Sequence, residues 1–209
     1  MLRIHRRFVV TLVFVLTSIH LAVAQNTATG RVAQSYRLRG TILEANDRAM
    51  VFKERGGEIS TIEFDDQFSI QEVYPIAMST IERNSFIGTA ALADSNGRLV
   101  AIEVHVFPES MRGTGEGHRP WDSLPGSTMT NANVEELISV GGSRELHLKY
   151  KDGEKVVFVP EGAPIVTYRP GNSSLLVSGA NVIVVAYEKN GKPTASRITV
   201  GRDGFKPPM

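Results

Sequence analysis

The sequence contains no cysteine. This absence excludes disulfide bonds, a thiol nucleophile, cysteine-ligated zinc or iron–sulfur centres, and an N-terminal cysteine that carries lipid. A chain of this length buries enough apolar surface to fold without disulfides. Because small eukaryotic secreted domains often depend on disulfides, the absence fits export to a bacterial periplasm better than a eukaryotic secretory route.

Long apolar runs are also missing after residue 24, where nothing approaches the ~20 residues that cross a bilayer. The start of the chain differs. A basic segment, residues 1–7, precedes a 14-residue apolar run over residues 8–21, and Ala22-Val23-Ala24 follows. This pattern predicts a signal peptide over residues 1–24, cleavage after Ala24 and a periplasmic protein. The alternative is an uncleaved N-terminal anchor.

The chain has no excess of one charge. The expected signal peptide carries three arginines and no acid, so the mature chain keeps 20 Lys and Arg against 22 Asp and Glu, a formal charge of about −2. Nucleic-acid binding needs clustered positive charge. We therefore expect no nucleic-acid partner.

Motifs of catalysis are absent as well. No Gly-x-Ser-x-Gly turn surrounds Ser110, Ser123 or Ser127. The adjacent acids Asp65 and Asp66 fall at the end of a predicted strand, where successive side chains point to opposite faces, so a turn explains them better than an acid–base pair. We expect a protein that is not an enzyme.

What the chain does contain is a series of short β-type runs in two similar halves. Alternating apolar residues, interrupted by Gly, Asn and Asp, predict these strands. The first half has strands at 36–45, 50–54, 58–64, 85–93 and 98–107, with a short helical candidate at 78–83. The second half has strands at 134–140, 144–150, 154–159, 164–168, 180–188 and 193–200, with a turn or helix at 173–177.

A nearly constant offset relates the two halves. Their Asn-Gly hairpin turns, Asn96-Gly97 and Asn190-Gly191, lie 94 residues apart, and the Gly57 and Gly153 turns lie 96 apart. Such an offset indicates duplication. We predict an all-β fold of two tandem small OB-like β-barrels, each with one short helical turn. The expected barrels span 34–107 and 129–203, joined by a loop at 108–128 and followed by a tail at 204–209.

Two motifs carry a resemblance to known proteins. Each half resembles small exported bacterial domains of unknown function with an OB-like barrel, through Gly40-Thr41-Ile42, the run from Ser85 to Ile102 and the run from Ser178 to Ile198. The segment from His105 to Asp122 is similar to a group of exported proteobacterial proteins that carry the automatic label "metal ABC transporter permease". A permease needs several apolar spans, which this chain lacks after residue 24. The resemblance therefore implies fold and compartment, with a hint of metal or transport association.

The 108–128 loop is the densest stretch of functional side chains. Glycine-hinged loops on plain scaffolds commonly carry binding sites. Its candidate ligand-binding residues are Arg112, Glu116, His118, Arg119, Trp121 and Asp122.

Each of these side chains has a structural explanation beside the functional one. Trp121, the only tryptophan, either fills the gap between barrels or stacks on a sugar, peptide or lipid headgroup. The two arginines either bind an anion with exposed loop amides or pair with Glu109, Glu116 and Asp122. The glycine spacing does not match a phosphate-binding loop.

Three residues are candidates for a divalent metal such as Zn²⁺. Glu103 and His105 alternate with aliphatic residues and are expected on the outward face of the strand that enters the loop, while His118 lies on the loop itself. Mixed histidine and carboxylate ligands suit such metals. The alternative is one exposed histidine on a sheet face and one bonded to nearby backbone.

These observations lead to one expected function and an alternative. We expect a monomeric, soluble periplasmic binding or accessory protein whose partner is an unidentified protein or small ligand. The alternative is a periplasmic protein that binds a divalent metal or assists metal transport. A hydrolase that uses such a metal to activate water ranks below both.

Overall fold

The computed structural model describes residues 34–208, and its elements are strands and short 3-10 turns. The expected all-β class is therefore confirmed. The expected signal peptide and its cleavage position lie outside the described residues. Within residues 34–208, no helix has the length and apolar character that crossing a membrane requires.

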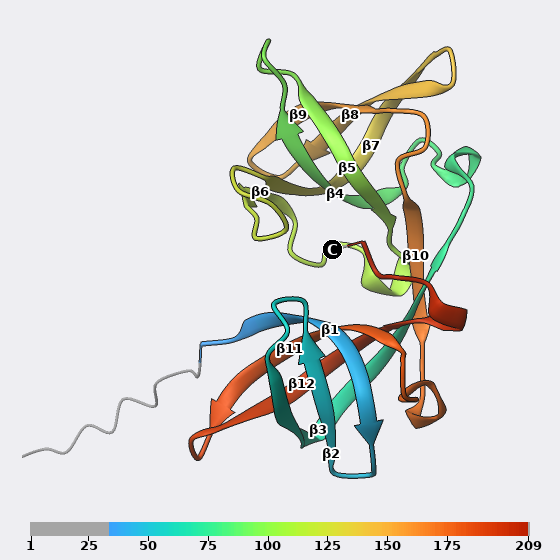
Figure 1. The fold of residues 1–209 in the computed structure, drawn as a ribbon. Helices are drawn as coiled ribbons and strands as arrows, with labels where there is room; N and C mark the ends of the chain where they lie inside the picture. The colour runs from blue at the N-terminus through green and yellow to red at the C-terminus, as the bar shows by residue number, and fades with distance from the viewer. Residues whose placement is uncertain (1–33, 209) are drawn as a thin grey trace, which may run out of the picture. The chain divides into compact units, whose positions relative to one another are not determined.

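Five strands close into a barrel, called here the first ring (Figure 1). They pair in the order β12–β11–β1–β2–β3, and a parallel pairing of β3 with β12 closes the ring. Apolar side chains such as Phe52, Ile62 and Ile198 fill its interior. The strands are β1 (Tyr36–Ala45), β2 (Ala49–Glu54), β3 (Ile59–Pro75), β11 (Asn181–Lys189) and β12 (Lys192–Gly201).

A second ring of pairings runs in the order β5–β4–β7–β8–β9. A short parallel pairing closes it, with Leu99 of β5 opposite Val157 of β9. Val104, Val134 and Leu146 are buried in its interior. Its strands are β4 (Phe86–Ala93), β5 (Leu99–Val106), β7 (Thr128–Val140), β8 (Ser143–Tyr150) and β9 (Gly153–Val159).

The two rings are built from exchanged hairpins. The late hairpin β11–β12 completes the first ring, and the early hairpin β4–β5 completes the second. The ranges 34–107 and 129–203 therefore do not each close on themselves, which corrects the expected division. Both hairpins present alternating apolar faces and follow a short turn, so their local sequences do not distinguish which ring each one closes.

A continuous ladder of hydrogen bonds joins the rings. β3 is 17 residues long, and its end pairs antiparallel with β10 (Ile165–Pro170). β10 in turn pairs in parallel with β5 of the second ring. Both rings accordingly belong to one compact unit, which includes the described residues 34–208.

The expected strands are confirmed with shifted ends. β3 continues past the expected residue 64 to Pro75, and β7 begins at Thr128, before the expected residue 134. Polar residues hide the alternation in both extensions, but neighbouring strands supply their backbone partners. The expected helical turns appear as η1 (Met78–Thr80) and η3 (Ser173–Leu175), each ahead of a hairpin.

The expected loop and tail are more ordered than the sequence predicts. The 108–128 segment contains the turn η2 (Glu109–Met111) and the strand β6 (Gly117–Pro120), which pairs with β7. The chain end begins with the turn η4 (Arg202–Gly204), and Phe205 packs on a small cluster around Val73 and Tyr168. Tertiary pairing outweighs the weak β propensity of Gly and Pro in β6.

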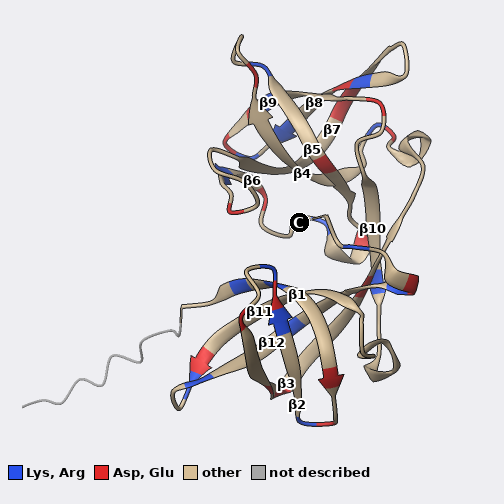
Figure 2. Ribbon diagram, in the orientation of Figure 1, with Lys and Arg blue, Asp and Glu red and all other residues tan. Residues whose placement is uncertain are grey.

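Charged residues of both signs are interspersed over the strands and turns of both rings (Figure 2). This distribution agrees with the near balance of Lys and Arg against Asp and Glu in the sequence. Any local excess of one sign therefore comes from the way the fold brings particular residues together.

Candidate functional site

A cavity of about 240 Å³ lies between outer faces of the two rings. Side chains that point away from the barrel interiors line it, together with residues of the 108–128 segment. Because residues directly opposite one another on paired strands share a face, the strand registers show how each wall is assembled.

The first wall is the outer face of β1, β11 and β12. Arg37 lies opposite Val185, and Val185 lies opposite Arg197, so two arginines flank one valine across three strands. The next row places Ile183 beside Thr199. All five of these side chains line the cavity: Arg37, Ile183, Val185, Arg197 and Thr199. Strand pairing therefore brings together arginines that are 160 residues apart in the chain.

The second wall is the outer face of β5, β4, β7 and β6. His105 lies opposite Gly88, and Gly88 lies opposite Asn131. Gly88 has no side chain between its neighbours, and an added Cβ would come within 2.7 Å of Asn131 Oδ1. In the adjacent row, Met129 lies opposite Arg119 of β6.

Three buried side chains form a row across the second wall toward β10: Glu103, His105 and Tyr168. Glu103 is 0% exposed and His105 is 2% exposed. Nε2 of His105 lies 3.3 Å from Oε1 of Glu103, and Nδ1 of His105 contacts the hydroxyl of Tyr168. His105 and Tyr168 line the cavity, whereas Glu103 is not among the lining residues.

The burial of Glu103 and His105 corrects the expectation of an exposed strand face. The predicted alternation holds, because Val104 between them points into the interior of the second ring. What the sequence does not show is that this outer face is covered, for example by Tyr168 from β10. No hydrogen-bond donor reaches either carboxylate oxygen of Glu103 with good geometry among the described residues.

Tyr168 keeps its proton. Burial, and secondly the nearby Glu103, raise the pKa of the Tyr168 hydroxyl above its ordinary value. A protonated phenol can donate to Nδ1 of His105, and in the tautomer that accepts this hydrogen bond Nε2 carries the proton that faces Glu103. This arrangement supplies a fixed polar floor and does not make an activated nucleophile.

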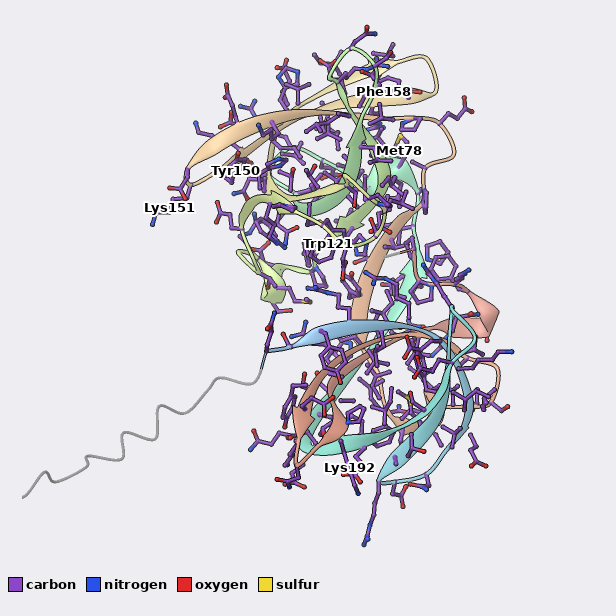
Figure 3. All side chains as sticks on the ribbon, turned by 60° about the vertical axis from the view of Figure 1, so that its left-hand side comes forward. Met78, Trp121, Tyr150, Lys151, Phe158 and Lys192 are labelled. Atoms are coloured by element: carbon purple, nitrogen blue, oxygen red, sulfur yellow. The ribbon has the colours of Figure 1, made fainter. Side chains whose placement is uncertain are left out.

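Trp121 lies between the strands of the first ring and those of the second ring (Figure 3). This position is the one expected for a side chain that fills the gap between the barrels. The guanidinium of Arg37 stacks 4.3 Å from its ring centroid, and that of Arg119 lies 5.4 Å away. Its indole Nε1 is buried and has no hydrogen-bond partner within the part of the chain that the structure describes. Trp121 therefore contacts the first ring and also lines the cavity.

Asp122 binds the first ring and not the loop arginines. It accepts a hydrogen bond of 2.8 Å from Arg39 and lies 4.0 Å from Arg37. Burial has the largest single effect on the pKa of Asp122 and raises it, but the hydrogen bond from Arg39 and the charges of Arg39 and Arg37 together hold this pKa below its usual range. The expected pairing of Asp122 within the loop is thus wrong.

Arg112 and Glu116 lie outside the cavity lining. Arg112 pairs with Glu109 at 2.6 Å, as one of the structural interpretations predicted, and donates to Asn133 at 2.5 Å. Glu116 accepts a hydrogen bond from the backbone N–H of Lys151 at 2.9 Å. Both side chains hold the 108–128 segment in place.

His118 belongs to neither the cavity nor the buried row. Its Nδ1 lies 2.8 Å from the Thr130 hydroxyl. Burial, followed by the charges of Lys155 and Arg119, lowers the pKa of His118. Of the three expected metal ligands, the structure joins Glu103 and His105 only, and residues 34–208 hold no cluster of three or more His, Asp or Glu arranged to bind a metal ion.

Sequence reasoning found Arg119 and Trp121 but missed Arg37, Asn131, Tyr168 and Arg197 as cavity residues. The missed residues lie on four strands of ordinary composition. Arg37 lies between Tyr36 and Leu38, and Arg197 alternates with Ile198 and Val200 on one side, which marks both arginines as outward-facing. Only the strand register could show that they share one wall.

The chain matches no protein-family model, no curated protein and no solved structure. The site's geometry is therefore the basis for the functional proposal.

Proposed function

We propose that this protein is a non-enzymatic binding protein of the periplasm that holds a small ligand in the cavity between its rings. The observation that carries the proposal is a pair of buried polar atoms on the cavity wall, Asn131 Oδ1 and Trp121 Nε1, which have no hydrogen-bond partner among residues 34–208. Buried polar atoms in folded proteins nearly always have hydrogen-bond partners. A bound ligand would supply them.

The composition of the lining supports the same proposal. Binding cavities are concave and mostly apolar, with a few polar groups that fix the orientation of the ligand. Here Phe107, Met129 and Ile183 supply apolar surface, while Arg197 and Asn131 supply polar groups. The volume of about 240 Å³ lies below the ~300–1,000 Å³ typical of drug-sized ligands. The proposed ligand is therefore small.

We propose that each ring is an OB-like barrel and that the two are tandem copies with exchanged hairpins. In each ring, three successive antiparallel strands are joined by a hairpin whose last strand runs parallel to the third. Both hairpins also shift register at equivalent places, between Ala90 and Ala91 in one and between Val185 and Ala186 in the other.

Native mass spectrometry of the purified mature protein, under conditions that retain small ligands, tests the binding proposal. Val185→Phe would fill the cavity from the centre of its first wall, because Val185 lies between Arg37 and Arg197. Val156→Phe is the matched control, since Val156 is 44% exposed on β9 and is not a lining residue. We expect a retained or added small molecule on the wild type and on Val156→Phe, and none on Val185→Phe. Equal retention by all three proteins would contradict the proposal.

A further inference from the structure

We infer that the ligand is a small organic anion, a carboxylate carried on an aromatic or branched apolar body, whose charged group lies among Arg37, Arg119 and Arg197. The inference rests on the proposed function, because it assigns a chemical class to the ligand of the same cavity. Its evidence is separate, however, since it depends on charge and not on unpartnered polar atoms.

The cavity wall carries positive charge without matching negative charge. Three arginines line it, and no Asp or Glu does. Arg119 donates to the uncharged carbonyl of Gly115 at 2.7 Å. Arg197 forms no ion pair with any carboxylate among residues 34–208. Cations that are held close together without counter-ions attract an anion.

Asp122, the acid that forms an ion pair with one of these arginines, is already bound more closely to another residue. Asp122 lies 2.8 Å from Arg39, which is not a lining residue, and only 4.0 Å from Arg37. At 4.0 Å the contact with Arg37 is at the limit of an ion pair. Asp122 therefore neutralises Arg39 first and leaves an excess of positive charge at the cavity.

The arginines also repel each other. Burial, and secondly the charge of Arg37, lower the pKa of Arg119 below its ordinary value. Both guanidinium groups lie near the Trp121 ring, at 4.3 Å for Arg37 and 5.4 Å for Arg119. An anion placed beside them would offset this repulsion, and a planar carboxylate matches the planar donor geometry of a guanidinium.

The rest of the wall indicates an apolar body. Met129 is 2% exposed and Ile183 is 7% exposed, and both line the cavity with Phe107 and Val185. A cavity of about 240 Å³ has room for a compact group and not for a polymer or a nucleotide. A fully hydrated inorganic anion would leave this apolar surface uncovered. The combination therefore favours a compact amphiphilic carboxylate.

A matched set of probes separates charge from shape. Benzoate, benzamide and benzylamine have the same ring with a negative, neutral or positive substituent, and cyclohexanecarboxylate keeps the charge on an aliphatic body. Fluorescence of Trp121, the only tryptophan, reports binding at the cavity directly. Calorimetry on the same samples gives the affinity.

We expect a carboxylate, benzoate or cyclohexanecarboxylate, to bind at least about tenfold more tightly than benzamide, because a charge-assisted hydrogen bond strengthens binding by about that factor. Arg197→Gln and Arg119→Gln should each weaken carboxylate binding by about tenfold and weaken benzamide binding much less, because benzamide carries no charge. Arg83→Gln is the matched control, since Arg83 is exposed and does not line the cavity. It should have no effect.

Equal or tighter binding of benzamide or benzylamine would overturn the inference and leave the proposed binding function intact. Carboxylate binding that is insensitive to both arginine variants would overturn it too. Absence of binding by every probe would overturn the assigned class. The proposed function is tested separately, and it fails if native mass spectrometry shows equal retention of small molecules by the wild type, Val156→Phe and Val185→Phe.

Discussion

The hydroxyl of Tyr168 on β10 contacts Nδ1 of His105 on β5, and both side chains line the cavity. The two strands run parallel and come from different halves of the chain. Behind His105 lies Glu103, which is fully buried. The polar floor of the cavity is therefore formed where the hydrogen-bond ladder joins the two rings.

Tyr168→Phe should destabilise the protein. It removes the donor to Nδ1 of His105 and leaves that nitrogen buried without a partner, which costs about 1–3 kcal/mol in the free energy of unfolding. Urea unfolding of the two proteins measures the difference. Tyr150→Phe is a suitable control, because Tyr150 lies on β8 with its ring against the second-ring interior and does not line the cavity. Equal stability of Tyr168→Phe and the wild type would show that the contact contributes nothing.

Glu72 should make stability depend on pH. It is 2% exposed and accepts hydrogen bonds from Arg169 and Arg202. Hydrogen bonding from Arg169 is the main cause that lowers its pKa below the ordinary glutamate value of 4.5. Because the folded-state pKa is the lower one, the stabilisation is complete above the unfolded-state pKa and is lost as pH falls through the folded-state pKa.

Glu72→Gln tests this dependence. We expect a loss of about 1–3 kcal/mol in unfolding free energy at neutral pH, less than for a fully buried pair because both arginines are about half exposed. The difference between variant and wild type should shrink as the solution is acidified below the ordinary glutamate pKa. A difference that stays constant across the acid range would rule out this role of the carboxylate.

Arg112→Ala should affect stability and not ligand binding. Arg112 joins the 108–128 segment to β7 and to the turn before β4, through Asn133 and the carbonyl of Asn84. Loss of these bonds should cost about 1–2 kcal/mol of unfolding free energy. Carboxylate affinity, measured by calorimetry, should stay within twofold of wild type at temperatures where the variant is folded. A large loss of affinity would show that Arg112 contributes to ligand binding.

The exchanged hairpins predict that neither half of the chain can form a complete ring without the other half. Fragments 34–113 and 114–208, produced together by cutting the exposed Gly113–Thr114 bond, should associate as a stoichiometric pair, because each ring draws strands from both fragments. Size-exclusion chromatography and circular dichroism of the fragments, alone and mixed, measure this. Two separate folded monomers with no association would show that each half closes its own barrel.

Local features of the sequence predicted most of the strands. Alternation and the Asn96-Gly97 and Asn190-Gly191 turns depend on neighbouring residues, so they placed both hairpins correctly. The exchange of these hairpins was not predictable from such signals, because equivalent hairpins offer similar apolar faces to either ring. Pairing between strands distant in sequence decides between them.

The candidate site was predictable only in part, for the same reason. Arg119 and Trp121 lie together on one segment, where their unusual composition is visible in the sequence. Arg37 and Arg197 become neighbours of one valine only through the registers of three strands. His105 has the predicted orientation on its strand, but its burial depends on Tyr168 from β10.

The central claim, that a small anion occupies the cavity beside Trp121, is tested most directly by the indole N–H signal of Trp121 in a proton–nitrogen NMR titration. With one tryptophan in the chain, this signal is unambiguous. On addition of benzoate or cyclohexanecarboxylate, we predict a saturable shift of the indole signal in the wild type and no shift in Val185→Phe. Saturable binding by calorimetry with an unmoved indole signal in the wild type would place the ligand elsewhere and contradict the claim.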